Sequence, residues 1–158
     1  VYGIYDAKVM GNKIILRRSQ GTLCFSKKIA TKLLRKLANS SSIGNMKVAL
    51  QLVTIGVKIK TKTERLGKRK QIEKQFLMHG LAAETCEALA KWCNLKIERE
   101  LNWKKSLRLR PGYPIWPNLS EQKKIFILLH PHKIGVSLTE NYQMAPEYST
   151  SAIVLNVS

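Results

Sequence analysis

The sequence predicts an α+β fold, with a mixed or antiparallel sheet, one long helix and shorter helices. Short apolar segments of strand-like composition occur in both halves of the chain, and residues 71–101 carry a long helical pattern between them. The strands and helices do not follow the regular alternation that is typical of parallel α/β sheets. The chain has 158 residues, 44% of them apolar, which is enough for the core of one domain. We therefore expect a single domain over residues 1–158.

The opening segment is expected to begin the sheet. Residues 9–17 have the pattern of a hairpin, with Gly11 and Asn12 as its turn. A short apolar segment follows at 22–25. A helix is then expected over residues 27–38, with apolar side chains on one face and basic side chains on the other.

The middle of the chain is expected to contain two more strands and the long helix. Residues 39–45 have loop composition, and residues 47–55 are rich in strand-forming side chains. Residues 57–62 alternate apolar and Lys side chains, as a half-exposed strand does. The helix expected over 71–101 has one apolar stripe, made of Ala82, Cys86, Leu89, Cys93 and Ile97.

The last third mixes an irregular loop, a short helix and two strands. Residues 106–118 are rich in Arg, Pro, Gly and aromatic side chains, which indicates a well-fixed loop. A short helix capped by Ser120 is expected to end before Pro131. Strands are expected at 134–138 and 151–157.

The chain is strongly basic, and the charge is uneven. Its net charge is +18, and residues 1–79 hold 18 Lys and Arg against three acidic residues, whereas residues 80–158 hold ten against seven. Such a field attracts polyanions, acidic proteins or anionic membrane surfaces. The basic face at 27–38 is most simply a solvated surface, and it also fits a membrane-surface helix or a docking face. Residues 58–70 have the charge needed to contact phosphates, so nucleic-acid binding stays open.

The composition also bears on the cellular setting. Three cysteines, an odd number without metal-ligand spacing, are typical of a reducing cytoplasm. No apolar run approaches the length of about 18 residues that a membrane span needs. The chain starts with Val1 and lacks a signal-peptide pattern, so we interpret it as a processed product or a piece of a longer protein.

Common catalytic signatures are missing from the sequence. It contains no catalytic triad pattern, P-loop, Rossmann glycine motif or HExxH zinc motif. His130 and His132 offer two metal ligands, but a pair around a proline is more typical of a loop. Cys86 and Cys93 lie two helical turns apart on the apolar stripe, which indicates buried core thiols.

The segment at 108–114 is the most informative one. Gly112 permits a close approach of the backbone to a ligand, and two prolines stiffen the loop, which lowers the ordering cost of binding. Arg108 and Arg110 offer planar forks for a carboxylate, and Tyr113 adds an aromatic face. A rigid surface loop with two solvated arginines is an equally good interpretation of this segment alone.

Four sequence blocks resemble a known family. RLRPGYPIWP at 108–117 resembles the RxxxGYPxxP signature of the activation domain of cobalamin-dependent methionine synthase. IGVSLTE at 134–140, followed by MAPEYSTSA at 144–152, is similar to the IGVxLTE and MxPExSTSA stretch of that family. Residues 51–56 and 79–90 match as well, and all four blocks follow the order of the family.

The resemblance implies a module that binds S-adenosylmethionine. In that family the domain covers the cobalamin module during repair, when the cofactor has lapsed to cob(II)alamin. An electron from a flavodoxin-like donor and a methyl group from S-adenosylmethionine then restore methylcobalamin. The partners implied for this chain are therefore a cobalamin-binding module and a flavodoxin-like electron donor.

The resemblance also implies a set of site residues. Arg108 would pair with the carboxylate of S-adenosylmethionine, and Glu87 would hold its ammonium group. The backbone at Arg110 and Gly112, with Tyr113, would line the adenosyl side. One cation and one anion suit a zwitterionic ligand end, although for Glu87 the residues alone leave open a plain surface pair with Lys91.

The sequence also departs from that family in several ways. It has no cobalamin-ligating DxHxxG motif, so the cobalamin would be held by a partner, and no zinc or folate module fits in its length. We find no counterpart of the family's acidic ligand-binding position near the start of the domain. Two alternatives stay open: a degenerate activation-like fold that binds RNA or another polyanion through its basic half, and a purely structural part of a larger methionine synthase.

Overall fold

A computed structural model describes residues 1–10, 13–18, 21–25 and 46–157, and it confirms the α+β class. Its main sheet has six strands in the order β3-β2-β1-β4-β8-β5, and every pairing in it is antiparallel. The strands are β1 (Tyr2–Met10), β2 (Lys13–Arg18), β3 (Gly21–Phe25), β4 (Met46–Thr54), β5 (Ser106–Leu109) and β8 (Ser149–Asn156).

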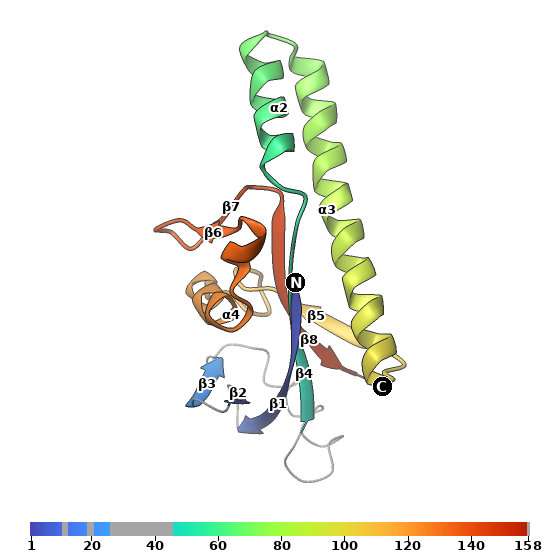
Figure 1. Cartoon of the computed structure of the whole chain (residues 1–158), viewed down its shortest axis with the longest axis vertical. Helices are drawn as coiled ribbons and strands as arrows, with labels where there is room; N and C mark the ends of the chain where they lie inside the picture. Colours follow the sequence, from blue (N-terminus) through green and yellow to red (C-terminus); the bar gives the residue numbers. More distant parts are fainter. Residues whose placement is uncertain (11–12, 19–20, 26–45, 158) are drawn as a thin grey trace.

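Helices cover the two faces of this sheet. Helix α3 (Ile72–Leu101) runs along one face, and α4 (Gln122–Leu129) lies on the other (Figure 1). Strand residues alternate between the faces, so that Leu50 and Ile153 pack in a core with α4 while Ala49 and Val154 pack against α3. The expected stripe of α3 is largely confirmed, because Ala82, Cys86, Ala90, Cys93 and Ile97 are buried and Leu89 is half-buried.

A helical arm extends beyond the end of the sheet. It consists of α2 (Val57–Lys68) and the first turns of α3, which pack side by side (Figure 1). The strand predicted at 57–62 is therefore wrong. Thr63 is buried and Leu66 half-buried. These two residues lie three apart, on the same face of the helix, and α2 packs against α3.

The second half differs from its sequence prediction in detail. Residues 106–109 form strand β5 rather than loop. The cap expected of Ser120 is provided by Asn118, whose side chain accepts from the Ser120 backbone N–H at the start of η2 (Leu119–Glu121). A second 3₁₀ turn, η3 (Pro131–Ile134), takes part of the segment predicted as a strand at 134–138, and only β6 (Ser137–Leu138) remains, paired with β7 (Met144–Ala145).

Several predictions concern residues that lie outside the described ranges. These are the turn at Gly11 and Asn12, the basic helix at 27–38 and the loop at 39–45. The hairpin around the turn is confirmed, because Met10 and Lys13 are register partners in β1 and β2. Within the described part of the chain, no helix is long and apolar enough to cross a membrane.

Candidate functional site

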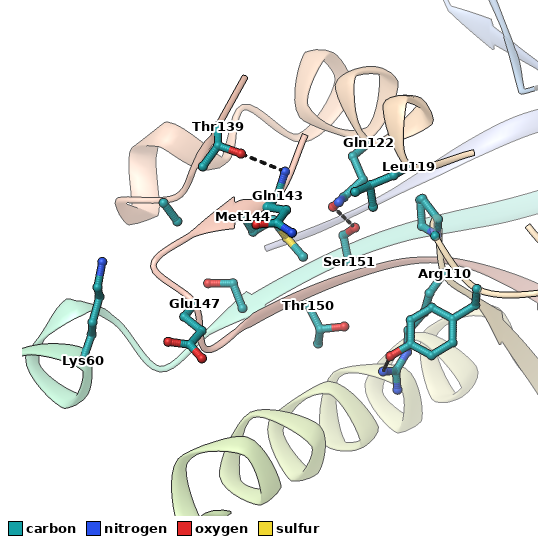
Figure 2. A pocket seen from close by; sticks show the side chains of 15 residues that line it. Lys60, Arg110, Leu119, Gln122, Thr139, Gln143, Met144, Glu147, Thr150 and Ser151 are labelled. Atoms are coloured by element: carbon teal, nitrogen blue, oxygen red, sulfur yellow. Dashed lines mark hydrogen bonds between the residues drawn. The ribbon is translucent and has the colours of Figure 1, made fainter. Parts of the chain in front are cut away.

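A cleft of about 700 Å³ lies between the segment that follows β5 and the segment that leads into β8. One wall is made of residues 110–113 with Leu119 and Gln122, and the other of residues from Thr139 to Ser151. Lys60 of α2 reaches the cleft at the end opposite Arg110 (Figure 2). The volume lies within the range of about 300–1,000 Å³ that is usual for small-molecule sites.

The loop at 110–113 is held by a tight backbone turn. The Gly112 N–H donates to the Trp116 carbonyl, and the Trp116 N–H donates to the Tyr113 carbonyl, each over 2.8 Å. Gly112 has φ +87°, a conformation that side chains rarely adopt. A Cβ added there would lie 2.9 Å from Leu119 Cδ1. The sequence therefore needs glycine at 112 to hold the loop against η2, and this turn leaves Tyr113 55% exposed beside the cleft.

Polar side chains tie the two walls of the cleft together. The Ser151 hydroxyl donates to Gln122 Oε1 over 3.0 Å (Figure 2), and Gln122 Nε2 donates to the Tyr142 carbonyl over 2.8 Å. The Thr139 hydroxyl accepts from the Gln143 backbone N–H over 3.1 Å. These bonds connect α4, the β6–β7 hairpin and β8, so the shape of the cleft is set by three separate segments of the chain.

Arg110 joins the loop to the long helix through Glu87. Its Nη1 donates to Glu87 Oε1 over 2.7 Å and its Nη2 to Glu87 Oε2 over 2.5 Å, which is a bidentate pair. The Arg110 guanidinium also lies 5.4 Å from the centre of the Tyr113 ring. Arg110 lines the cleft, whereas Glu87 is not among the lining residues.

Arg108 lies beside this pair and is more deeply placed. Only 17% of its side chain is exposed, and its Nη2 lies 3.7 Å from Glu87 Oε2. Its Nε and Nη2 are buried and donate no hydrogen bond within the described structure. Burial, and then the nearby positive charge of Arg110, lower the pKa of Arg108 from its ordinary value. Arg108 is thus a largely buried cation whose Nε and Nη2 form no hydrogen bond within the described residues.

The structure brings the five predicted site residues together at one corner of the cleft. Arg110, Gly112 and Tyr113 line it directly, while Glu87 and Arg108 stand behind Arg110. Glu87 pairs with Arg110, and the surface pair with Lys91 that the residues left open is not among its contacts in the described structure. The second wall was not predicted from the sequence, although its residues Met144, Glu147 and Ser151 belong to the block MAPEYSTSA that carries the resemblance.

The other candidate groups lie elsewhere. His130 and His132 are exposed with ring centres 5.9 Å apart, and no cluster of three His, Cys, Asp or Glu side chains suited to a metal occurs in the described ranges. Cys86 and Cys93 are buried free thiols, as the stripe predicted. Burial raises the pKa of both.

Known proteins resemble this chain over most of its length. A family model described as "Vitamin B12 dependent methionine synthase, activation domain" matches residues 1–157. The methionine synthase of Mycobacterium tuberculosis is 28% identical over 196 aligned residues, which cover 99% of this chain and 16% of that protein. The methionine synthase of Mycobacterium leprae is 29% identical over 127 aligned residues, covering 67% of this chain and 10% of its own length. The chain thus spans a small part of either relative.

A solved structure confirms the fold. The crystal structure of the MetH reactivation domain bound to AdoHcy superposes with a TM-score of 0.76, covering 98% of this chain and 57% of that chain, at 18% identity. The fold and the resemblance predicted from the sequence are therefore both confirmed. Because the family model matches nearly every residue, this chain belongs to the family of vitamin B12-dependent methionine synthase activation domains.

Proposed function

We propose that this chain binds S-adenosylmethionine, and its demethylated product S-adenosylhomocysteine, in the cleft beside Arg110. We further propose that it thereby supports the reductive methylation of cob(II)alamin held by a partner module. The main support is that the family signature at 108–117 supplies one wall of the cleft. The solved relative of the same fold was crystallised with AdoHcy.

The residues present fit such a ligand. The buried Nε and Nη2 of Arg108 form no hydrogen bond in the described structure, and a carboxylate supplies the paired acceptors that a guanidinium prefers. The exposed ring of Tyr113 offers an apolar face to an adenine. Glu87 provides the negative charge for an ammonium group, provided that Arg110 releases it.

The contribution of the chain is positioning. When bound, S-adenosylmethionine supplies a methyl group on an already activated sulfonium, so the chain needs no acid or base of its own. Arg108, Tyr113 and the backbone at Gly112 would hold the ligand in one orientation toward the partner. The cobalt chemistry belongs to the cofactor, which a cobalamin-binding module would carry.

Two partners and a cellular setting follow from this proposal. The cobalamin-binding module is one partner, and a flavodoxin-like electron donor is the other, attracted by the positive field of the chain. The free thiols of Cys86 and Cys93 support a reducing cytoplasm.

Calorimetric titration of the whole chain with S-adenosylmethionine tests the proposal. We expect saturable binding that Arg108→Ala weakens by about tenfold or more, the effect of one lost charge-assisted contact. Arg99→Ala is the matched control, because Arg99 is exposed in the last turn of α3. Its affinity should equal that of the unchanged chain. No heat and no thermal shift at millimolar ligand would contradict the proposal.

A second candidate function is the binding of RNA or another polyanion. Lys58, Lys62, Arg65 and Arg69 line one shallow groove of about 320 Å³ along α2. Their spacing of four, three and four residues places them on one helix face. Affinity for a single-stranded RNA should then fall by roughly 0.7 log unit per log unit of salt for each phosphate that is neutralised. A flat salt response would exclude this function.

A further inference from the structure

We propose that Arg110 is a specificity-determining residue, which occupies Glu87 so that the ammonium group of a ligand reaches this carboxylate only by displacing the arginine. The inference rests on the proposed function, since it concerns the amino-acid end of the same adenosyl ligand. The resemblance implied a ligand contact only for the backbone of Arg110, whereas this inference concerns its side chain.

The geometry of the pair supports this role. Both oxygens of Glu87 accept from Arg110, over 2.7 and 2.5 Å, so the carboxylate has its best-directed lone pairs engaged. The two side chains are 41% and 26% exposed, so solvent can replace either partner. Arg110 lines the cleft and Glu87 does not. A ligand in the cleft therefore meets the guanidinium before it meets the carboxylate.

The local charge also opposes the entry of an ammonium group beside Glu87. Two guanidinium groups, those of Arg108 and Arg110, share the single carboxylate of Glu87 at 3.7 and 2.5 Å. The three groups together carry one net positive charge. An ammonium group that enters beside them adds a third cation to one anion, whereas a carboxylate brings the complementary charge. As it stands, this corner favours the acidic end of a ligand over its basic end.

Tyr113 provides the alternative contact that makes displacement feasible. Its ring centre lies 5.4 Å from the Arg110 guanidinium and its hydroxyl 3.5 Å from Arg110 Nη1. A guanidinium that leaves Glu87 can keep this aromatic contact. Arg110 therefore has two sets of partners, and only one of them blocks the carboxylate.

The consequence is a specific pattern of ligand preference. With Arg110 on Glu87, the α-amino group of a ligand gains little, because each bond that it forms requires the loss of a bond already present. With Arg110 removed, the amino group and Glu87 form a new charge-assisted bond without competition. The discrimination between ligands with and without this group should therefore rise when Arg110 is truncated.

Calorimetry with two ligands on the whole chain tests the inference. The first ligand is S-adenosylhomocysteine, and the second is the same thioether with hydrogen in place of the α-amino group. In the unchanged chain we expect the two dissociation constants to agree within about threefold, because the amino group exchanges one bond for another. In Arg110→Ala we expect the ligand with the amino group to bind about tenfold more tightly than the other.

Two further variants isolate the cause. Glu87→Gln in the Arg110→Ala background should remove the preference again, because the carboxylate that creates it is gone. Arg99 is exposed on α3, the helix that also carries Glu87. Arg99→Ala should leave the ratio of the two dissociation constants as in the unchanged chain. If Arg110→Ala fails to fold, as judged by its thermal transition, Arg110→Gln serves for the same comparison.

The outcomes separate this inference from the proposed function. If both ligands bind and truncation of Arg110 leaves their ratio unchanged, the inference is overturned and the proposed function stands. If neither ligand binds any folded variant, both are overturned. A preference that appears on truncation and disappears with Glu87→Gln supports both.

Discussion

Ser151 of β8 and Gln122 at the start of α4 meet inside the wall of the cleft, where the serine hydroxyl donates to the glutamine amide oxygen over 3.0 Å. Both side chains are almost completely buried, at 3% exposure each. The bond ties the central sheet to the helix that covers it. Its loss leaves the buried Gln122 Oε1 without a donor.

Ser151→Ala should therefore destabilise the chain. Removal of the hydroxyl leaves Gln122 Oε1 buried and unpaired, at a cost of about 1–3 kcal/mol in the free energy of unfolding. Urea denaturation measures this change. Ser137→Ala is the matched control, because Ser137 is exposed on β6, and it should change the unfolding free energy by less than about 0.5 kcal/mol. Equal effects of both substitutions would contradict the structural role of the buried bond.

Two glycines should respond in opposite directions to alanine. Gly112→Ala forces a side chain onto a backbone with φ +87° and places its Cβ against Leu119, at a cost of about 1–3 kcal/mol. It should also weaken ligand binding, because the loop must shift. Gly80→Ala lies inside α3 with open space around the new Cβ, and it should stabilise the chain by about 0.5–1 kcal/mol. Thermal unfolding of both variants checks the signs.

The hydroxyl of Tyr148 should contribute measurably to stability. It lies 2.9 Å from His79 Nδ1, and the tyrosine is only 5% exposed. Tyr148→Phe should cost about 0.5–1.5 kcal/mol in unfolding free energy, the usual net value of one such bond. Tyr113→Phe is the control, since Tyr113 is 55% exposed, and a cost as large as that of Tyr148→Phe would argue against the His79 contact.

The buried thiols should make stability fall at alkaline pH. Burial raises the pKa of Cys86 and Cys93 above the ordinary value of 9.0. Above pH 9.0 the unfolded chain therefore loses protons that the folded chain still holds, and the free energy of unfolding decreases as the pH rises through the folded pKa. Denaturation between pH 8 and 10 in a Cys24→Ser background measures the slope. Replacing Cys86 and Cys93 by alanine should reduce it, and an unchanged slope would contradict this origin.

The long periodic elements were predictable from the sequence. The strand predicted at 47–55 is observed at Met46–Thr54, and the helix predicted at 71–101 is observed at Ile72–Leu101. Both contain enough residues for their periodicity to be distinctive. Helix α2 was mistaken for a strand because Val57 and Ile59 alternate with lysines over only four residues. The helical pattern of burial in α2 depends on its packing against α3. The local sequence does not reveal this contact.

The candidate site was predictable in its composition and not in its contacts. The loop at 108–114 was recognised from its glycine, prolines and aromatic ring, since these residues restrict the backbone locally. The pairing of Arg110 with Glu87 was not, because the composition of a loop does not show which carboxylate on a distant helix an arginine meets. The second wall depends on the pairing of β8 with β4 and β5, segments far apart in the chain.

The central place of β8 also dictates when the cleft can form during synthesis. Among the described strands β8 is the sole connection between β4 and β5, and its own residues run to Asn156. A ribosome adds residues in order, so β4 must wait with one edge unpaired while about one hundred further residues are made. The cleft is therefore completed only when β8 has been made, and translation rather than local propensity sets the moment at which it can form.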